Sequence, residues 1–273
     1  MNLTPDIETA YRPSDHTGVT ANVTSQPALW TLSDVWRLPL PELNAFDRVV
    51  GRLVMAFFRR RLLSVEGLEH IAPVNDPFVL IANHNQKAEA VLVPSLMITL
   101  RGGRGIRFLS DWMFQLIPVV SLIIRRGRVI TLTNKPARPR FLNLLKPLWH
   151  DPLPALVRAR KALEQGECVG VYPEGTLNRD PRRLLPGNPG AARLSLESGR
   201  PVVPLGIRFP GWPPDRPIGA HAKMALKIGA PLTPPVPARP GKPTPAEVRA
   251  WHAVLMQELS RLSGKTWSAP PRD

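Results

Sequence analysis

The chain has 273 residues, of which 43% are hydrophobic, enough to fill the core of one large domain or two small ones. Its 36 Lys and Arg residues against 21 Asp and Glu residues give a formal net charge of +15, so we expect a surface that attracts phosphates, anionic lipid headgroups or nucleic acid. A single cysteine, Cys168, excludes an intramolecular disulfide, and its place in the apolar run CVGV predicts a small buried hydrophobe.

The first 38 residues are polar, rich in Thr, Ser and Pro, and without periodicity, which predicts a mobile extension. They lack the basic start, apolar core and cleavage site of a secretory signal, so we expect a cytoplasmic protein. The longest apolar run is too short to span a bilayer. We predict one α/β domain over residues 39–265 and a disordered tail over residues 266–273.

Residues 43–63, LNAFDRVVGRLVMAFFRRRLL, predict an amphipathic helical segment in which five arginines surround an apolar face. The members of this face are Leu43, Phe46, Val50, Leu53, Val54, Phe57 and Phe58. Two interpretations remain open: a helix packed on the core with a basic solvated side, and an interfacial helix bound to an anionic membrane. The net charge favours the second, because each basic residue near anionic headgroups contributes about 1 kcal/mol.

Six apolar runs then alternate with helical patterns, which predicts an α/β fold with a mostly parallel or mixed central sheet flanked by helices. The predicted strands are residues 78–83, 106–110, 128–133, 168–173, 202–209 and 224–229. Two of the predicted helices cover residues 155–166 and 246–262. Sheets of this kind bind ligands beyond the carboxyl ends of their strands.

The stretch NHNQKAE places His84 after the first of these strands and Glu89 five residues later. On one uninterrupted helix the two side chains would point about 140° apart, so they can pair only if His84 precedes the helix. Asn83 or Asn85 is a plausible N-cap for such a helix. A carboxylate that orients a histidine makes it a general base, while the simpler interpretation is that His84 caps or packs at a strand end.

The stretch YPEGT, Tyr172 to Thr176, follows the strand predicted at residue 168. Gly175 allows a backbone N–H to approach an anion, Thr176 offers a hydroxyl, and Arg179 lies three residues further on. We therefore predict a phosphate site that includes Glu174, Gly175, Thr176 and Arg179. The alternative is an ordinary Pro-Gly turn with a solvated glutamate.

The two motifs together resemble those of the glycerolipid acyltransferase family, in which His-x-x-x-x-Asp and Phe-Pro-Glu-Gly-Thr follow an early and a later strand. The resemblance covers roughly residues 45–235 and includes the stretches LPGNPGAARLSLESGRPVVPLGI and KIGAPL. It implies phospholipid biosynthesis: transfer of a fatty acyl group from acyl carrier protein or coenzyme A to a hydroxyl of a phosphate-bearing glycerolipid, with neither a metal nor another cofactor.

By this resemblance His84 is the general base, Glu89 its orienting carboxylate, and Glu174, Gly175 and Thr176 part of the acceptor-phosphate site. The segment RRGRVITLTNK resembles a further phosphate-binding motif of the family, with Arg125, Arg126 and Arg128 as candidates.

The chain departs from the family pattern at two places. Glu89 stands where the family has aspartate, and Asn188-Pro189 stand where many members have a basic residue. Both departures bear on activity and on the choice of acceptor.

Three functions are therefore weighed. The first is an acyltransferase that acts on a lysophospholipid and is peripherally bound to the anionic inner face of a membrane. The second is a catalytically altered member of the family that binds lipid at a membrane or acylates a different acceptor. The third, a nucleic-acid binder, has only the basic charge in its favour, because the sequence contains no recognition motif and no basic-aromatic array.

Overall fold

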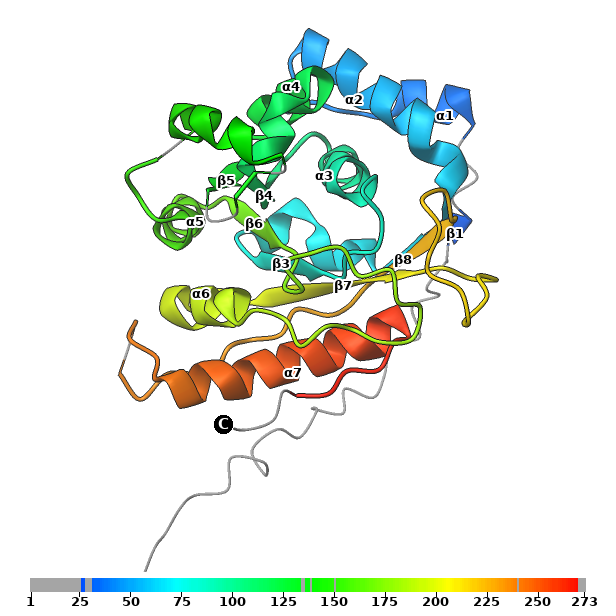
Figure 1. Cartoon of the computed structure of the whole chain (residues 1–273). Coiled ribbons are helices and arrows are strands. Elements are labelled where there is room, and N and C mark those ends of the chain that lie inside the picture. Colours follow the sequence, from blue (N-terminus) through cyan, green and yellow to red (C-terminus); the bar gives the residue numbers. More distant parts are fainter. Residues whose placement is uncertain are drawn as a thin grey trace, which may run out of the picture.

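An eight-stranded sheet runs through the middle of the computed structural model, which describes residues 26–27, 31–133, 136–137, 139–149, 151–239 and 241–269 (Figure 1). The strands are β1 Gln26–Pro27, β2 Leu62–Glu66, β3 Val79–Ala82, β4 Ile106–Asp111, β5 Ile130–Leu132, β6 Cys168–Val171, β7 Val202–Arg208 and β8 Met224–Ile228. Their order is β1-β2-β8-β7-β3-β6-β4-β5. The pairs β1/β2 and β7/β8 are antiparallel and the other five pairs are parallel, which confirms the predicted mixed sheet.

The central strand β3 is buried on both faces because helices cover both sides of the sheet. Leu80 and Ala82 pack into a core that includes residues of the helices α2 (Ala45–Phe58) and α3 (Glu89–Leu100). Val79 and Ile81 pack into a second core with the helices α5 (Ala155–Glu164), α6 (Gly190–Ser198) and α7 (Pro245–Ser263). A continuous apolar run of this kind is what a strand between two helical layers requires, and the run FVLIA supplies it.

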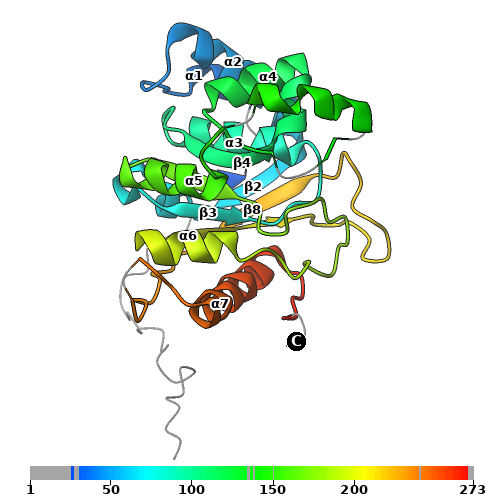
Figure 2. The ribbon, with the colours of Figure 1, turned by 60° about the vertical axis from the view of Figure 1, so that its left-hand side comes forward.

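Helices form the two outer layers (Figures 1 and 2). The α-helices are α1 Leu32–Arg37, α2 Ala45–Phe58, α3 Glu89–Leu100, α4 Pro118–Arg126, α5 Ala155–Glu164, α6 Gly190–Ser198 and α7 Pro245–Ser263. Short 3-10 helices are η2 Arg59–Arg61, η3 Leu68–Ile71, η4 Pro73–Asn75, η5 Trp112–Leu116 and η6 Arg140–Trp149. Within the described residues, none of the helices is both long and apolar enough to cross a membrane.

All six predicted strands and the helices predicted at residues 155–166 and 246–262 are confirmed, with small differences at their ends. Cys168 is buried as predicted, and this burial raises the pKa of its thiol to about 12. The predicted amphipathic helix is confirmed as α2, but it ends at Phe58. The two leucines that follow its arginines begin β2 instead, because pairing with β8 recruits them into the sheet.

Residues 31–38 of the predicted extension include a helix, α1. Thr31 and Asp34 form a capping box at the start of α1, and Val35 is completely buried in the core beside α2. Residues 26–27 pair with β2 as strand β1. The remainder of the predicted extension lies outside the described residues.

The first residues of the predicted tail, Thr266 and Trp267, make hydrogen bonds to the loop after β6. The backbone N–H of Thr266 donates to the Arg182 carbonyl at 2.8 Å, and the Trp267 indole donates to the Pro186 carbonyl at 3.1 Å. The segment after α7 therefore lies against the loop that follows β6, and residues 270–273 lie outside the described part of the chain.

Candidate active site

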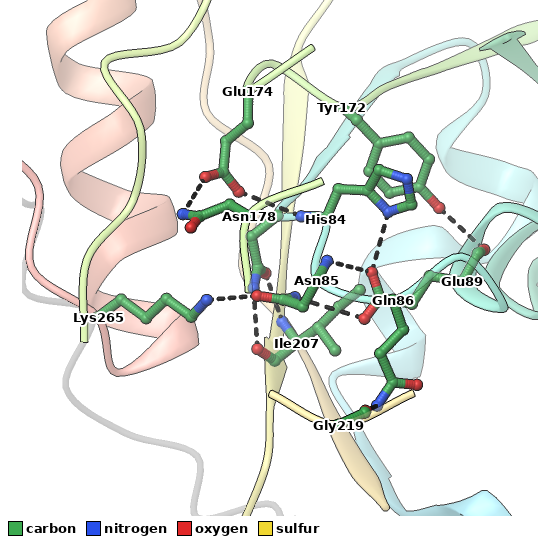
Figure 3. A network of polar contacts seen from close by, with 11 residues as sticks. His84, Asn85, Gln86, Glu89, Tyr172, Glu174, Asn178, Ile207, Gly219 and Lys265 are labelled. Carbon is green, nitrogen blue, oxygen red and sulfur yellow. Dashed lines mark hydrogen bonds and ion pairs between the residues drawn. The ribbon is translucent and has the colours of Figure 1, made fainter. Parts of the chain in front are cut away.

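The two sequence motifs meet because β3 and β6 are neighbouring parallel strands. Ile81 of β3 pairs with Val171 of β6, so the residues that follow both strands leave the sheet at the same edge. His84 follows the first strand and Glu174 follows the second. The backbone N–H of His84 donates to the Glu174 carboxylate at 3.2 Å, which joins the motifs directly (Figure 3).

His84 lies in the turn between β3 and α3, as the pairing with Glu89 requires. The chain is held where it leaves the sheet by Asn83, whose side chain accepts from the Ile207 N–H at 2.7 Å and donates to its carbonyl at 3.0 Å. The predicted capping role of Asn83 or Asn85 is wrong: the N-cap is Ala88, which has no side-chain oxygen to offer.

Glu89 is the first residue of α3, and its side chain folds back over the turn. One carboxylate oxygen, Oε2, lies 3.0 Å from His84 Nδ1 and 2.6 Å from the Asn85 backbone nitrogen. The other oxygen, Oε1, accepts from the Asn85 side-chain amide at 3.4 Å. A carboxylate at a helix N-terminus is also stabilised by the helix dipole, so the position suits a charged group that is completely buried.

The contact with Glu89 determines which tautomer the neutral His84 imidazole adopts. A carboxylate oxygen only accepts hydrogen bonds, so His84 donates its Nδ1 proton to Glu89 and, in the neutral ring, keeps Nε2 as an unprotonated acceptor. The His84 ring stacks on Tyr172 with 4.4 Å between ring centroids, and the Tyr172 hydroxyl donates to the Glu89 carbonyl at 3.1 Å. Burial raises the pKa of Tyr172 well above its usual value, so the hydroxyl stays a neutral donor. Such an arrangement can act as a general base with an orienting carboxylate.

Protein donors surround the side chain of Glu174. Its carboxylate is buried and accepts from the His84 backbone, from the Asn178 amide at 2.6 Å and from the Leu185 N–H at 2.9 Å. These contacts fix the loop against His84, and the predicted place of Glu174 in an acceptor-phosphate site stays a prediction. Asn178, which sequence reasoning missed, completes the link by donating its backbone N–H to the His84 carbonyl at 2.8 Å.

Gly175 and Thr176 are exposed at the turn that follows Tyr172. Gly175 has a φ of +66° and donates its N–H to the Tyr172 carbonyl at 3.0 Å, so the turn needs a residue that adopts left-handed backbone without strain. Their predicted contact with an acceptor phosphate stays a prediction.

Beside this turn lies an open pocket of about 630 Å³ lined by residues 179–183 and 214–217. Four of the lining residues are arginines and two are aspartates: Arg179, Arg182, Arg183, Arg216, Asp180 and Asp215. Arg179 Nε donates to the Ile218 carbonyl at 2.7 Å, which fixes the guanidinium at the pocket. Of the arginines predicted as phosphate ligands, Arg179 lines this pocket and lies three residues after the turn at Gly175 and Thr176.

The structure does not bring the other three predicted arginines to His84. Arg126 pairs with Asp47 of α2 at 2.7 Å, and Arg128 pairs with Glu167 at 2.5 Å. Glu167 comes directly before β6, so this ion pair lies at the amino ends of the parallel strands, opposite the edge that carries His84. Arg125, in the last turn of α4, also precedes its strand and is exposed.

The departure at Asn188 has a structural explanation. Its backbone N–H donates to the Pro173 carbonyl at 2.7 Å, and its side-chain oxygen accepts from the Gly190 N–H at 3.0 Å. Asn188 thus anchors the start of α6 to the loop after β6.

Comparison with known proteins gives matches at three levels. Residues 63–208, more than half of the chain, match the family model described as Acyltransferase. Two chloroplastic 1-acyl-sn-glycerol-3-phosphate acyltransferases are similar: BAT2 of Brassica napus is 26% identical over 147 residues, and LPAT1 of Arabidopsis thaliana is 25% identical over 149 residues. The aligned regions cover 54% and 55% of this chain but only 37% and 36% of the two plant proteins.

The fold is similar to the crystal structure of PlsC, the 1-acyl-sn-glycerophosphate (LPA) acyltransferase of Thermotoga maritima. The TM-score is 0.51 at 21% sequence identity, and the match covers 87% of this chain and 81% of that one. At this identity the likeness concerns the fold alone.

Proposed function

The chain belongs to the acyltransferase family, and we propose that it transfers a fatty acyl group from an acyl thioester to a hydroxyl of a phosphate-bearing glycerolipid. The observation that carries this proposal is the 3.0 Å contact between His84 Nδ1 and the buried Glu89 carboxylate. The arginine-lined pocket is linked to His84 through the loop after β6, because Asn178, next to Arg179, donates its backbone N–H to the His84 carbonyl. The donor thioester is carried by coenzyme A or by acyl carrier protein.

In the proposed reaction His84 acts first as a base. Its Nε2 takes the proton of the acceptor hydroxyl while the hydroxyl oxygen attacks the thioester carbonyl carbon. Glu89 keeps the proton on Nδ1 and stabilises the imidazolium that forms. Collapse of the tetrahedral intermediate breaks the carbon–sulfur bond, and the departing sulfur takes the proton back from Nε2. The products are an ester and a free thiol, and His84 returns to its neutral form.

The pocket beside His84 supports an acceptor that carries phosphate. Its four arginines and two aspartates leave a net positive lining, and arginine binds phosphate oxygens through paired N–H groups. The segment from His84 to the pocket is continuous through hydrogen bonds: Asn178 N–H donates to the His84 carbonyl, and Ile218 N–H donates to the Arg179 carbonyl at 2.7 Å. In this proposal the acceptor phosphate binds in the pocket and the acceptor hydroxyl reaches His84.

Exposed apolar side chains support attachment to a membrane surface. On α2 the residues Phe46, Val49, Leu53 and Phe57 form one exposed stripe, with Phe57 72% exposed. On η6, which lies with α4 on the same outer side of the molecule, Leu144 is 85% exposed (Figures 1 and 2). The whole chain has a net charge of +15, which favours contact between this side and an anionic bilayer, where the lysophospholipid acceptor resides.

The experiment that tests the proposal offers the purified chain lysophosphatidic acid, lysophosphatidylcholine and glycerol 3-phosphate with isotope-labelled acyl-coenzyme A or acyl carrier protein, and identifies products by mass. We expect labelled diacyl product from lysophosphatidic acid. His84→Ala should reduce its formation by roughly 1,000-fold or more, because the general base is lost together with its positioning. The matched control is His70→Ala, on the amino-end side of the sheet, where the ring pairs only with Glu69 at 3.6 Å.

Transfer by His84→Ala at the wild-type rate would exclude the base. Absence of product with every acceptor, in a protein that still binds vesicles, would instead favour the second function considered above, a lipid-binding member of the family without catalysis.

A further inference from the structure

A buried lysine lies behind the His84–Glu89 pair (Figure 3). Lys265 follows α7, well beyond the family match that ends at residue 208, and is only 5% exposed. Its Nζ donates to the side-chain oxygen of Asn85 and to the backbone carbonyl of Asp180 at 2.7 Å. A lysine in such a place is uncommon, because burying an ammonium group costs several kcal/mol unless it is well paired.

The contact with Asn85 connects this lysine to the catalytic pair. Because Lys265 takes the side-chain oxygen of Asn85, the amide nitrogen of Asn85 turns toward Glu89 Oε1, at 3.4 Å. The Asn85 backbone N–H meets Glu89 Oε2, the same oxygen that accepts from His84. Lys265, Asn85, Glu89 and His84 thus form one chain of hydrogen bonds.

Charge adds a second link. Burial lowers the pKa of Lys265, and the carboxylates of Glu174, Glu89 and Asp180 oppose that effect. Two of these carboxylates, Glu89 and Glu174, are themselves buried on either side of His84. The lysine is therefore the positive partner of a small buried cluster whose other charges are negative.

We propose that Lys265 is a positioning residue for the His84–Glu89 pair, holding Asn85 against Glu89 and lowering the proton affinity of the His84 ring through its charge. This inference rests on the proposed function, in which His84 must be unprotonated to accept a proton. Without the lysine, the carboxylate at the ring, Glu89, and the carboxylate at the backbone N–H of His84, Glu174, would lack this positive partner, and protonation of His84 would become more favourable.

The pH dependence follows from the titratable groups around His84: Glu89 from α3, Tyr172 and Glu174 from the segment after β6, and, through Asn85, Lys265 from the segment after α7. Asp180 acts on Lys265. Removing the positive charge of Lys265, which Asn85 links to Glu89, should raise the pH at which the ring titrates. The acid limb of the kcat/KM profile should move by the same amount.

The test compares Lys265→Met, which removes the charge at similar volume, with Lys265→Arg, which keeps it. NMR titration of histidine-labelled protein follows the His84 ring directly, with the resonance assigned from its absence in His84→Ala. We expect an upward shift in Lys265→Met and a midpoint closer to that of the wild type in Lys265→Arg. The control Lys227→Met removes a lysine that pairs with Glu66 at 3.5 Å, and it should change neither the titration nor the activity.

Kinetics supply a second readout. In Lys265→Met we expect kcat on the plateau to fall roughly 10-fold or more with little change in the donor KM, because a misplaced base affects the chemical step. Thermal unfolding checks that the variants are folded.

The NMR titration needs no substrate, so the inference and the proposed function can fail separately. A wild-type protein without transferase activity would refute the function, while the titration would still decide whether Lys265 governs the ring. The inference would be overturned if the His84 titration midpoint in folded Lys265→Met stayed within about 0.2 pH units of the wild-type midpoint or fell below it. A charge close to the His84 ring must change that midpoint when it is removed.

Discussion

Replacing Glu89 by aspartate is the sharpest test of how the structure prepares His84. Glu89 Oε2 lies 3.0 Å from His84 Nδ1 and 2.6 Å from the Asn85 nitrogen. Removing one methylene withdraws the carboxylate by about 1.5 Å, the length of a carbon–carbon bond. Both contacts would then stretch to roughly 4 Å, beyond the range of a hydrogen bond.

The backbone is not free to compensate for the shorter side chain. Glu89 opens α3, and the next turns of that helix are locked by Leu92, Val93 and Leu96, all completely buried in the core. An inward movement of the helix start would force these side chains against β3. We therefore expect kcat to fall roughly 100-fold, the cost of a displacement of about 1 Å at a catalytic group.

The assay is steady-state transfer to lysophosphatidic acid, together with NMR titration of the His84 ring. Because a more distant carboxylate stabilises the imidazolium less, the ring should titrate at lower pH in Glu89→Asp than in the wild type. Glu197→Asp is the matched control, since Glu197 on α6 pairs only with the exposed Arg193 at 2.7 Å. A Glu89→Asp protein with wild-type kcat and an unchanged titration would show that Glu89 does not orient His84.

Two further predictions concern the outer helices. The double substitution Leu53→Ser with Phe57→Ser should weaken flotation with anionic vesicles by roughly 10-fold or more, because each exposed side chain would otherwise bury apolar surface in the bilayer. Vesicle binding equal to that of the wild type would exclude α2 as the membrane contact. Gly206→Ala should lower the free energy of unfolding in urea by about 1–3 kcal/mol, because the new β-carbon would lie 2.3 Å from the Leu262 backbone where α7 crosses β7. Gly51→Ala, in open space within α2, should raise the free energy of unfolding by about 0.5–1 kcal/mol. The reverse order of stability would refute this packing argument.

The sequence by itself determined the alternation of strands and helices and the presence of two polar motifs at strand ends. The β3 run was recognisable because a strand between two helical layers must be apolar at every position. The pairing of His84 with Glu89 was also predictable, because a separation of five residues allows contact only across a turn.

Contacts from distant parts of the chain determine the surroundings of several predicted site residues. Glu174 reads as a phosphate ligand in YPEGT, but the His84, Asn178 and Leu185 donors that fold around it use its oxygens for support. Arg128 sits in a basic stretch, yet its partner Glu167 holds it at the opposite edge of the sheet. The local sequence shows which polar side chains a segment carries. Long-range packing determines which of these side chains have protein partners.

Lys265 is the clearest case of a role that only the tertiary structure reveals. Its sequence neighbourhood, SGKTW, has neither an apolar period nor a motif that indicates a buried charge. It reaches the catalytic turn because α7 packs along β7 and ends beside the loop that follows β6, bringing residue 265 to within hydrogen-bonding distance of residue 85. A hydrogen bond between residues 180 positions apart depends on how the layers stack, and the amino-acid pattern around either residue carries no record of it.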